Sequence, residues 1–159
     1  MPKLTTMLWF DTQAEEAANF YASVFKNSKV TGVTRYGEAG PGAPGSVMTV
    51  SFELEGREFT ALNGGPIFKF NESVSFVIHC NTQAEVDEYW AKLTANGGQE
   101  VECGWVKDCY GLSWQVVPDM LLELLSDPDQ AKSQRVMKAM LQMKKLDIAG
   151  LQRAAAGQG

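Results

Sequence analysis

Few side chains in this sequence could act as nucleophiles, general bases or metal ligands. There is one histidine, His79, and there are three cysteines, Cys80, Cys103 and Cys109. Nucleophilic catalysis needs a base close to the nucleophile, and no Ser/His/Asp or Cys/His pattern is recognisable around the single imidazole. We therefore interpret His79 as a polar residue at a strand end. The cysteines are odd in number and lack a Cys-x-x-Cys spacing, which indicates reduced thiols in packing or loop positions.

A glycine-rich segment, residues 40–45, formally fits the dinucleotide-binding pattern Gly-x-Gly-x-x-Gly. That pattern binds phosphate because backbone N–H groups and the N-terminus of a following helix face the ligand. Pro41 and Pro44 lack an N–H group, and the residues from Val47 onward have strand character. We therefore predict a mobile surface loop here and no phosphate site.

The tetrapeptide Thr-Gln-Ala-Glu occurs twice, at residues 12–15 and 82–85. Each copy follows an apolar run of strand character and begins a helical pattern that ends in an aromatic pair. Thr-x-x-Glu is a capping box: the Thr side chain accepts a hydrogen bond from the backbone N–H three residues on, and the Glu side chain accepts one from the Thr N–H. The repeat therefore predicts a duplicated β-α-β-β-β unit, which is an α+β fold.

The elements that would position the side chains follow from the hydrophobic period of each segment. In the first copy, the helix after Thr12 carries an apolar stripe from Ala14 to Phe25, suited to packing on a sheet. The first strand is expected to be buried on both faces, and the strands are predicted at residues 5–10, 30–36, 47–54 and 59–62. The second copy is predicted to have a helix from Thr82 to about Ala95 and strands at residues 74–80, 99–101, 105–106 and 112–117.

Beyond Pro118 the sequence changes to helical patterns. Asp127-Pro128 is typical of a helix start with proline at the first helical position, and a further short helix is predicted from Asp147. A methionine-rich stripe indicates a surface that packs against the domain or a twin subunit, with a flexible lid as the alternative. Its residues are Met137, Met140 and Leu141.

Composition limits the classes of partner. The chain has 159 residues, 45% of them hydrophobic and 21% charged, as expected for a globular protein. A net charge of -5 argues against a nucleic-acid partner, which needs a basic face. No apolar run approaches the roughly eighteen residues of a membrane span. The N-terminus leads directly into the first strand without the features of a signal peptide, so we expect a cytoplasmic protein with no membrane partner.

Short fragments along nearly the whole chain match one known family. They are Phe10-Asp11, Ala14-Glu15-Glu16-Ala17, Asn19-Phe20-Tyr21, Leu62-Asn63-Gly64-Gly65-Pro66, Cys103-Gly104-Trp105, Trp114-Gln115 and Leu141-Gln142-Met143-Lys144-Lys145. With the two repeated units, these fragments resemble the vicinal oxygen chelate superfamily of glyoxalase, bleomycin-resistance and dioxygenase proteins. Within it, they resemble the PhnB-like branch often labelled 3-demethylubiquinone-9 3-methyltransferase.

The resemblance implies two glyoxalase-like modules whose sheets form paired half-barrels around a pocket. The glyoxalase-like domain would span residues 1–118, with modules at 1–70 and 71–118, and a C-terminal helical extension would span 119–159. Relatives that use a metal bind it with two His and one or two Glu on inward strand faces. The corresponding positions in this chain are Thr5, Thr60, Ser75 and Gln115.

Those four positions carry hydroxyl or amide groups, which do not ionise and bind divalent transition ions poorly. His79 lies four residues beyond Ser75, about 13 Å along an extended strand, and is too distant to replace it. We therefore expect no metal. A methyl donor carrying an adenosine would need a glycine-rich turn between strand and helix, and the segment at 40–45 does not fit, so we expect no cofactor.

The resulting function hypothesis is a metal-independent protein that binds an apolar or aromatic small molecule. The expected pocket residues are Thr5, Met7, Trp9, Thr60, Leu62, Ser75, Val77 and Gln115. Three alternatives stay open: a superfamily enzyme of isomerase, lyase or dioxygenase type, a methyltransferase as the label says, and a dimeric protein that serves assembly only. We expect a homodimer. Trp9 is expected in the pocket, stacked on the ligand, and the alternative is that it fills the core.

Overall fold

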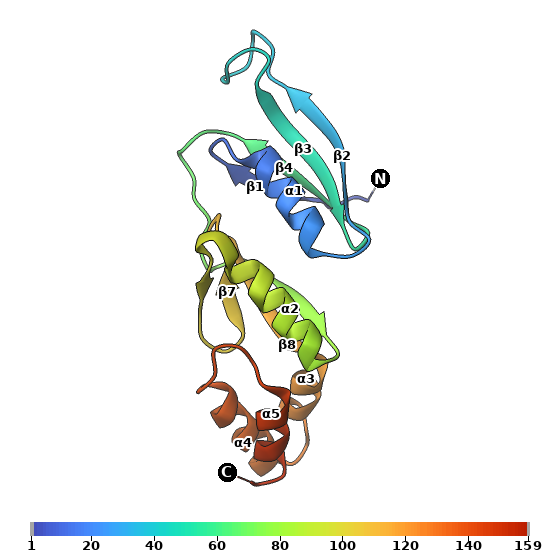
Figure 1. Cartoon of the computed structure of the whole chain (residues 1–159), viewed down its shortest axis with the longest axis vertical. Coiled ribbons are helices and arrows are strands. Elements are labelled where there is room, and N and C mark those ends of the chain that lie inside the picture. The colour runs from blue at the N-terminus through green and yellow to red at the C-terminus, as the bar shows by residue number, and fades with distance from the viewer. Residues whose placement is uncertain (1, 159) are drawn as a thin grey trace. The chain divides into compact units, whose positions relative to one another are not determined.

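The computed structural model describes residues 2–158 of the chain. Its contacts divide the chain into two compact units, one that extends to Phe70 and one that begins at Asn71. In Figure 1 the first unit is coloured from blue to green and the second from green to red.

The first unit is a four-stranded sheet with one helix. Its elements are β1 (Thr6–Phe10), α1 (Ala14–Val24), β2 (Lys29–Arg35), β3 (Val47–Leu54) and β4 (Arg57–Asn63). The strand order is β1-β4-β3-β2; β1 pairs with β4 in parallel, and the other neighbours are antiparallel. The tight turn between β3 and β4 has positive φ angles at Glu55 and Gly56, 50° and 81°.

The second unit repeats this arrangement and adds helices. Its repeated elements are β5 (Ser75–Cys80), α2 (Gln83–Thr94), a 3-10 turn (Ala95–Gly97), β6 (Gln99–Glu100), β7 (Trp105–Lys107) and β8 (Ser113–Pro118). The strand order is β5-β8-β7-β6, with β5 parallel to β8. Then come α3 (Asp119–Leu125), α4 (Gln130–Met140) and α5 (Ile148–Ala155). The predicted duplicated β-α-β-β-β fold of α+β class is therefore confirmed.

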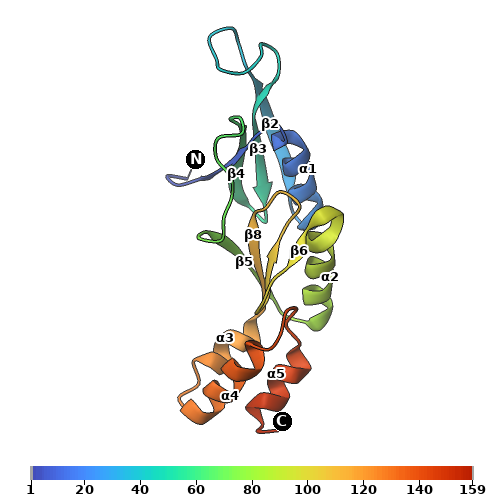
Figure 2. The same cartoon turned by 90° about the vertical axis from the view of Figure 1, so that its left-hand side faces the viewer.

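Each sheet has one face covered by its helix, α1 or α2, and one open face (Figures 1 and 2). In β1, Leu8 and Phe10 are buried, whereas Met7, on the opposite face, is 59% exposed. The expectation that this strand is buried on both faces was therefore wrong, because the first unit has a single helix and it packs on one face only. The sheets are open and do not close into barrels.

Aromatic rings form the centre of the first unit. Tyr21 of α1 stacks on Phe52 of β3 with ring centroids 6.1 Å apart, and Phe52 stacks on Phe59 of β4 at 5.3 Å. Ala14, Ala17 and Ala18 have no exposed surface, and small side chains there bring the helix close to the sheet. The predicted apolar stripe is therefore the packing face of α1.

The N-terminus of α1 is capped from a distant strand. The helix begins at Ala14, and neither Thr12 nor the N-cap residue Gln13 supplies a side-chain cap. Instead, the Asn63 Oδ1 atom at the end of β4 accepts a hydrogen bond of 2.8 Å from the Ala14 N–H. The capping box predicted at Thr12 was therefore wrong, and the side-chain acceptor at this helix start comes from the end of β4.

The second predicted capping box is present at the start of α2. The Thr82 hydroxyl accepts from the Glu85 N–H at 3.2 Å. The Glu85 carboxylate accepts from the Asn81 N–H at 3.3 Å, one residue before the expected partner. The helix ends where Asn96 and Gly97 adopt positive φ angles of 56° and 101°, as the sequence predicted.

The C-terminal helices are an integral part of the second unit. Their core is a cluster of buried side chains formed by Val117, Leu121, Val136, Leu146 and Leu151. The segment before α5 also bonds to the β6–β7 turn: the Cys103 and Gly104 N–H groups donate to the Met143 and Lys144 carbonyls, both at 2.8 Å. From α2, the Gln83 side chain donates to the Leu146 carbonyl and accepts from the Ile148 N–H. These contacts argue against a flexible lid.

The start of α4 differs from the prediction. Asp127-Pro128 was expected to begin the helix, but the N-cap is Asp129, whose side chain accepts from the Lys132 N–H at 3.3 Å. Asp127 instead accepts from the Asp129 N–H and forms an ion pair with Lys132. The turn before the helix therefore uses the first aspartate. The start of α5 after Asp147 is as predicted.

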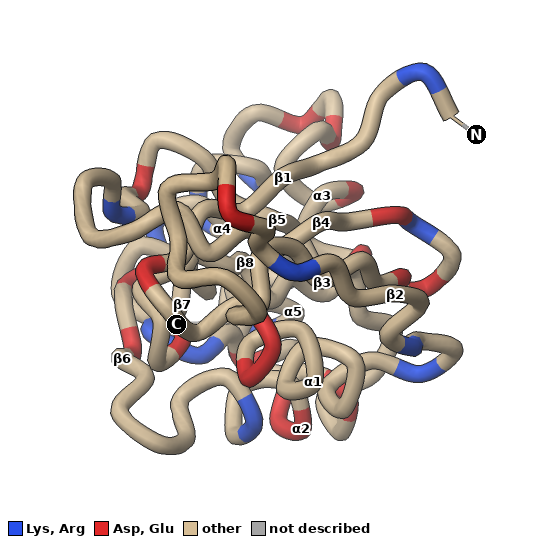
Figure 3. The backbone as a smooth tube through the Cα atoms, turned by 90° about the horizontal axis from the view of Figure 1, so that it is seen from above, with Lys and Arg blue, Asp and Glu red and all other residues tan. Residues whose placement is uncertain are grey.

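Two surface properties bear on partners. Within residues 2–158, no helix is long and apolar enough to cross a membrane. Figure 3 shows Lys and Arg scattered along the chain among Asp and Glu.

Candidate ligand-binding site

The open face of the second sheet presents its side chains in two rows across β5, β8 and β7. Strand register places Ser75 opposite Ser113, and Ser113 opposite Lys107, in the first row. The second row places Val77 opposite Gln115, and Gln115 opposite Trp105. Directly opposed side chains lie on the same face about 5 Å apart, so each row is a continuous strip.

The first row is polar, and one of its hydroxyls has no partner. The Gln115 Nε2 atom donates to the Ser75 Oγ atom at 3.0 Å, which links the two rows. Ser113 is only 1% exposed, and its Oγ atom has no hydrogen-bond partner among the described residues. A buried hydroxyl in this state is costly, because it has lost its water without gaining a replacement.

An ion pair lies at the end of the polar row. Lys107 pairs with the Glu72 carboxylate, and this hydrogen bond and charge lower the pKa of Glu72 below its usual value. Both side chains are accessible, at 31% and 54% exposure, so the pair is at the protein surface. Exposed ion pairs are held weakly and can open.

The second row is apolar at both ends. Val77 is 42% exposed, and Trp105 is half-buried beside Gln115. A flat indole and a branched aliphatic side chain on either side of an amide form a surface on which an apolar group can lie.

The open face of the first sheet is arranged similarly but differs in chemistry. Met7 lies opposite Thr60, and Trp9 lies opposite Leu62. Thr5, the expected first-strand position, comes before β1 and is exposed. All the expected site residues within strands therefore lie on open sheet faces: Met7, Trp9, Thr60 and Leu62 in the first unit, and Ser75, Val77 and Gln115 in the second.

Trp9 has structural contacts inside its own unit. Its Nε1–H donates to the Gly65 carbonyl at 2.9 Å, and its ring meets Phe68 edge-on with centroids 4.9 Å apart. The ring also lies directly over Gly64, where an added Cβ would be 2.3 Å from the indole. The indole N–H is therefore already bonded within the unit, although the side chain remains partly exposed.

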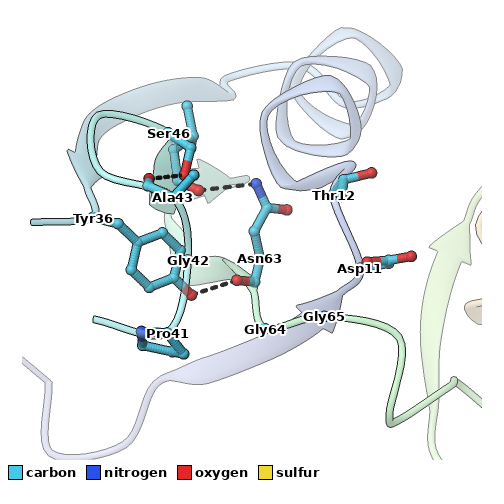
Figure 4. Close-up of a pocket in the computed structure, with 11 residues that line it drawn as sticks. Asp11, Thr12, Tyr36, Pro41, Gly42, Ala43, Ser46, Asn63, Gly64 and Gly65 are labelled. Atoms are coloured by element: carbon cyan, nitrogen blue, oxygen red, sulfur yellow. Dashed lines mark hydrogen bonds between the residues drawn. The ribbon is translucent and has the colours of Figure 1, made fainter. Parts of the chain in front are cut away.

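A separate hollow of about 470 Å³ lies in the first unit between the β2–β3 loop and the end of β4 (Figure 4). Asn63 joins its walls: besides capping α1, its Nδ2 atom donates to the Val47 carbonyl at 3.2 Å. The Tyr36 hydroxyl donates to the Asn63 carbonyl at 2.6 Å. These bonds fix the loop, the helix and the strand end to one another.

The glycine-rich segment forms one wall of this hollow and wraps around Tyr36. An added Cβ at Gly40 or Gly42 would lie 2.6 or 2.3 Å from the Tyr36 ring, so glycine is needed there for packing. The segment leads into β3 rather than a helix, as predicted, and no Lys or Arg lines the hollow. It therefore does not fit the phosphates of a dinucleotide or the adenosine portion of a methyl donor. The close packing on Tyr36 also explains these glycines without invoking a mobile loop.

Of the groups considered for catalysis, His79 lies on the open face of the second sheet, two residues beyond Val77 and opposite Val117, whereas Cys80 faces the other way. The His79 Nδ1 atom is 3.0 Å from an Asp119 carboxylate oxygen, and both side chains are about half exposed. Cys80 is buried, and burial, with smaller effects from the Glu85 and Asp119 charges, raises its thiol pKa to about 12. A thiol protonated at neutral pH is a poor nucleophile, so Cys80 serves packing.

The residues at the expected metal positions do not fit a divalent transition ion. The Thr5, Thr60 and Ser75 hydroxyls and the Gln115 amide remain neutral, and the latter two already bond to each other. Within residues 2–158, no three His, Cys, Asp or Glu side chains gather as metal ligands do.

The residues predicted from the sequence to line the pocket did not include three that lie on the open face: Lys107, Ser113 and Trp105. Their place beside Ser75 and Gln115 depends on which strands pair and in which register, and β7 has only three residues. Alternation within β8 could have placed Ser113 with Gln115, but the pairing with β7 has no local signal in the sequence.

Two β-α-β-β-β units, each with one helix-covered and one open sheet face, define a glyoxalase-like protein of the vicinal oxygen chelate superfamily. The chain belongs to the 3-demethylubiquinone-9 3-methyltransferase family, whose model matches residues 2–117. The α3–α5 extension, with the fragment at 141–145, lies outside that match. No match was found among curated proteins.

Solved structures agree with this assignment. The PhnB protein of Bacillus cereus, which carries the same family description, is 36% identical, with a TM-score of 0.66, over 74% of this chain and 99% of its own. A Pseudomonas aeruginosa protein is 16% identical with a TM-score of 0.60, over 74% and 98%. The fosfomycin resistance protein FosX of Listeria monocytogenes is 12% identical with a TM-score of 0.51, over 74% and 93%. The last two show the fold alone.

Proposed function

We propose that this protein binds an apolar or aromatic small molecule on its open sheet faces and does so without a metal ion. The observation that carries the proposal is the pairing of accessible apolar side chains with hydroxyl or amide groups on these faces. Met7 lies beside Thr60, and Val77 lies beside Gln115. Ligand sites combine a largely apolar surface with a few polar anchors in this way.

A ligand screen with face-blocking variants tests this proposal. Aromatic and aliphatic compounds are screened by ¹H–¹⁵N NMR, and resonances of the open faces are followed. Val77→Arg should abolish binding to the second sheet, because a long charged side chain would cover the apolar strip. Leu122→Arg on α3 is a matched control: Leu122 is 47% exposed, close to the 42% of Val77, but lies on a helix. Binding that survives Val77→Arg and Met7→Arg together would contradict the proposal.

Metal independence has its own test. We expect the purified protein to contain far less than one zinc, nickel, manganese or iron ion per chain by elemental analysis, because the four candidate ligands do not ionise. About one ion per chain, lost in Gln115→Leu or Thr60→Val, would favour a superfamily enzyme of isomerase, lyase or dioxygenase type.

We further propose that the protein is a cytoplasmic homodimer in which α4 contributes to the contact. Leu141 is 54% exposed at the end of α4, while Met140 packs partly into the C-terminal cluster. A biological dimer interface should bury more than about 1,000 Å². Sedimentation should show a dimer at micromolar concentration that Leu141→Glu weakens, and a monomeric native protein would contradict this.

A further inference from the structure

The open face of the second sheet has the composition of a carboxylate site next to an apolar surface. Its polar row ends in a cation, Lys107, and contains two hydroxyls, Ser75 and Ser113. The Ser75 oxygen accepts from Gln115, which leaves the Ser75 hydrogen available to donate. The row therefore offers three donor groups next to one another.

The Ser113 hydroxyl is a second, independent sign that this row has a polar partner. It is buried and lacks a hydrogen-bond partner among the described residues. Lys107 lies opposite Ser113 in the row, and because its ion pair with Glu72 is exposed, these two side chains can move. A ligand oxygen that reached Ser113 would remove the cost of the unsatisfied hydroxyl.

Glu72 indicates which kind of group this row binds. Its carboxylate sits on Lys107, and the lowered Glu72 pKa shows that Lys107 favours a negative oxygen at that position. Glu72 is tethered in the segment before β5 and leaves Ser113 without a partner. Glu72 therefore gives Lys107 a partner but leaves the Ser113 hydroxyl without one in the described part of the chain.

We propose that the ligand of this face is an apolar molecule with a carboxylate. The carboxylate displaces Glu72 from Lys107 and accepts hydrogen bonds from Ser113 and Ser75. The apolar body lies along the second row, between Trp105 and Val77. This inference rests on the proposed function and adds the chemical class of the ligand.

Matched pairs of probes test the inference in the full-length protein. Benzoate, phenylacetate and octanoate are each compared with the corresponding primary amide, which has nearly the same shape without the charge. We expect the carboxylates to shift the Trp105 indole N–H and Ser113 amide resonances and to bind roughly tenfold or more tightly than the amides, as one charged hydrogen bond implies.

Variants then assign the contact. Lys107→Met should weaken carboxylate binding about tenfold and leave amide binding unchanged. Glu72→Gln should strengthen it, because the competing carboxylate is gone. Ser113→Ala should weaken it without loss of folding, since that hydroxyl makes no bond in the free protein. Lys92→Met, which breaks the exposed Lys92–Glu88 pair on α2, is the matched control and should change nothing.

The outcomes separate the two proposals. If amides and other neutral compounds bind this face as well as carboxylates do, or if Lys107→Met leaves benzoate binding unchanged, the carboxylate inference is wrong and the binding function stands. If no carboxylate and no neutral compound shifts any open-face resonance, both are wrong. If Glu72→Gln weakens carboxylate binding, the proposed displacement is refuted.

Discussion

Replacing Asn63 with alanine should destabilise the first unit by about 1–3.5 kcal/mol. The change removes the acceptor of the buried Ala14 N–H, a helix cap that typically contributes about 0.5–2 kcal/mol. It also removes the donor to the Val47 carbonyl, a neutral hydrogen bond of about 0.5–1.5 kcal/mol. The Tyr36 bond goes to the Asn63 main chain and should survive the substitution.

Two threonine variants provide the comparison. Thr82→Ala removes an observed cap and should destabilise the second unit by about 1 kcal/mol. Thr12→Ala occupies the equivalent place in the repeat but removes no cap, so its effect should stay within about 0.5 kcal/mol. The sequence repeat predicts equal effects for the two variants, whereas the structure predicts an effect only for Thr82→Ala.

Urea unfolding followed by ¹⁹F NMR of 5-fluorotryptophan measures each unit separately. Trp9 is the only tryptophan among residues 1–70, while Trp90, Trp105 and Trp114 belong to the second unit. Asn63→Ala should lower the midpoint of the Trp9 signal. The reasoning is refuted if Asn63→Ala unfolds at the wild-type midpoint, or if Thr12→Ala costs as much as Thr82→Ala.

Three further outcomes follow from the structure. In urea unfolding, Trp9→Phe should lower the free energy of unfolding by about 0.5–1.5 kcal/mol, because the bond to Gly65 is lost. Trp9→Ala should lower it by about 3–5 kcal/mol. A negligible loss in Trp9→Ala would mean that the side chain only lines a pocket. Gly104→Ala should destabilise the second unit by about 1–3 kcal/mol, because Gly104 has a φ of 85° and an added Cβ would lie 2.8 Å from Leu146. An unchanged melting temperature would contradict this prediction. Burial raises the pKa of the Cys80 thiol from 9.0 to about 12, so between these pH values the thiol stays protonated in the folded chain and ionises in the unfolded chain. The free energy of unfolding should therefore fall as pH rises from 9 towards 12, and it should fall less steeply in Cys80→Ala. Identical slopes for the two proteins would argue against burial of this thiol.

The sequence predicted the order and kind of the elements because they depend on local signals. Strand alternation, the apolar stripe of α1 and the cap at Thr82 each lie within one short segment, and the structure agrees with them. The Asn63 cap could not be predicted in this way, because its two partners are 49 residues apart. A local capping signal at Thr12 was overridden by an acceptor delivered from another strand.

The candidate site was predictable only in part for the same reason. Alternation placed Met7 and Trp9 on one face and Ser75 and Val77 on the corresponding face of the repeat, and the registers agree. The partner of the Trp9 N–H lies 56 residues away, so no local pattern showed that it was already bonded. The neighbours of Gln115 likewise depended on how β7 pairs.

The contribution of the C-terminal helices to the core of the second unit affects how the chain folds during synthesis. All elements of the first unit precede Phe70, so it can fold while the ribosome is still translating the rest. The second unit cannot complete its core until Leu151 has left the exit tunnel, because Leu146 and Leu151 belong to the cluster that covers Val117. In ribosome-bound chains stalled after about residue 120, the first unit should therefore resist protease digestion, whereas the part of the second unit already made should be digested.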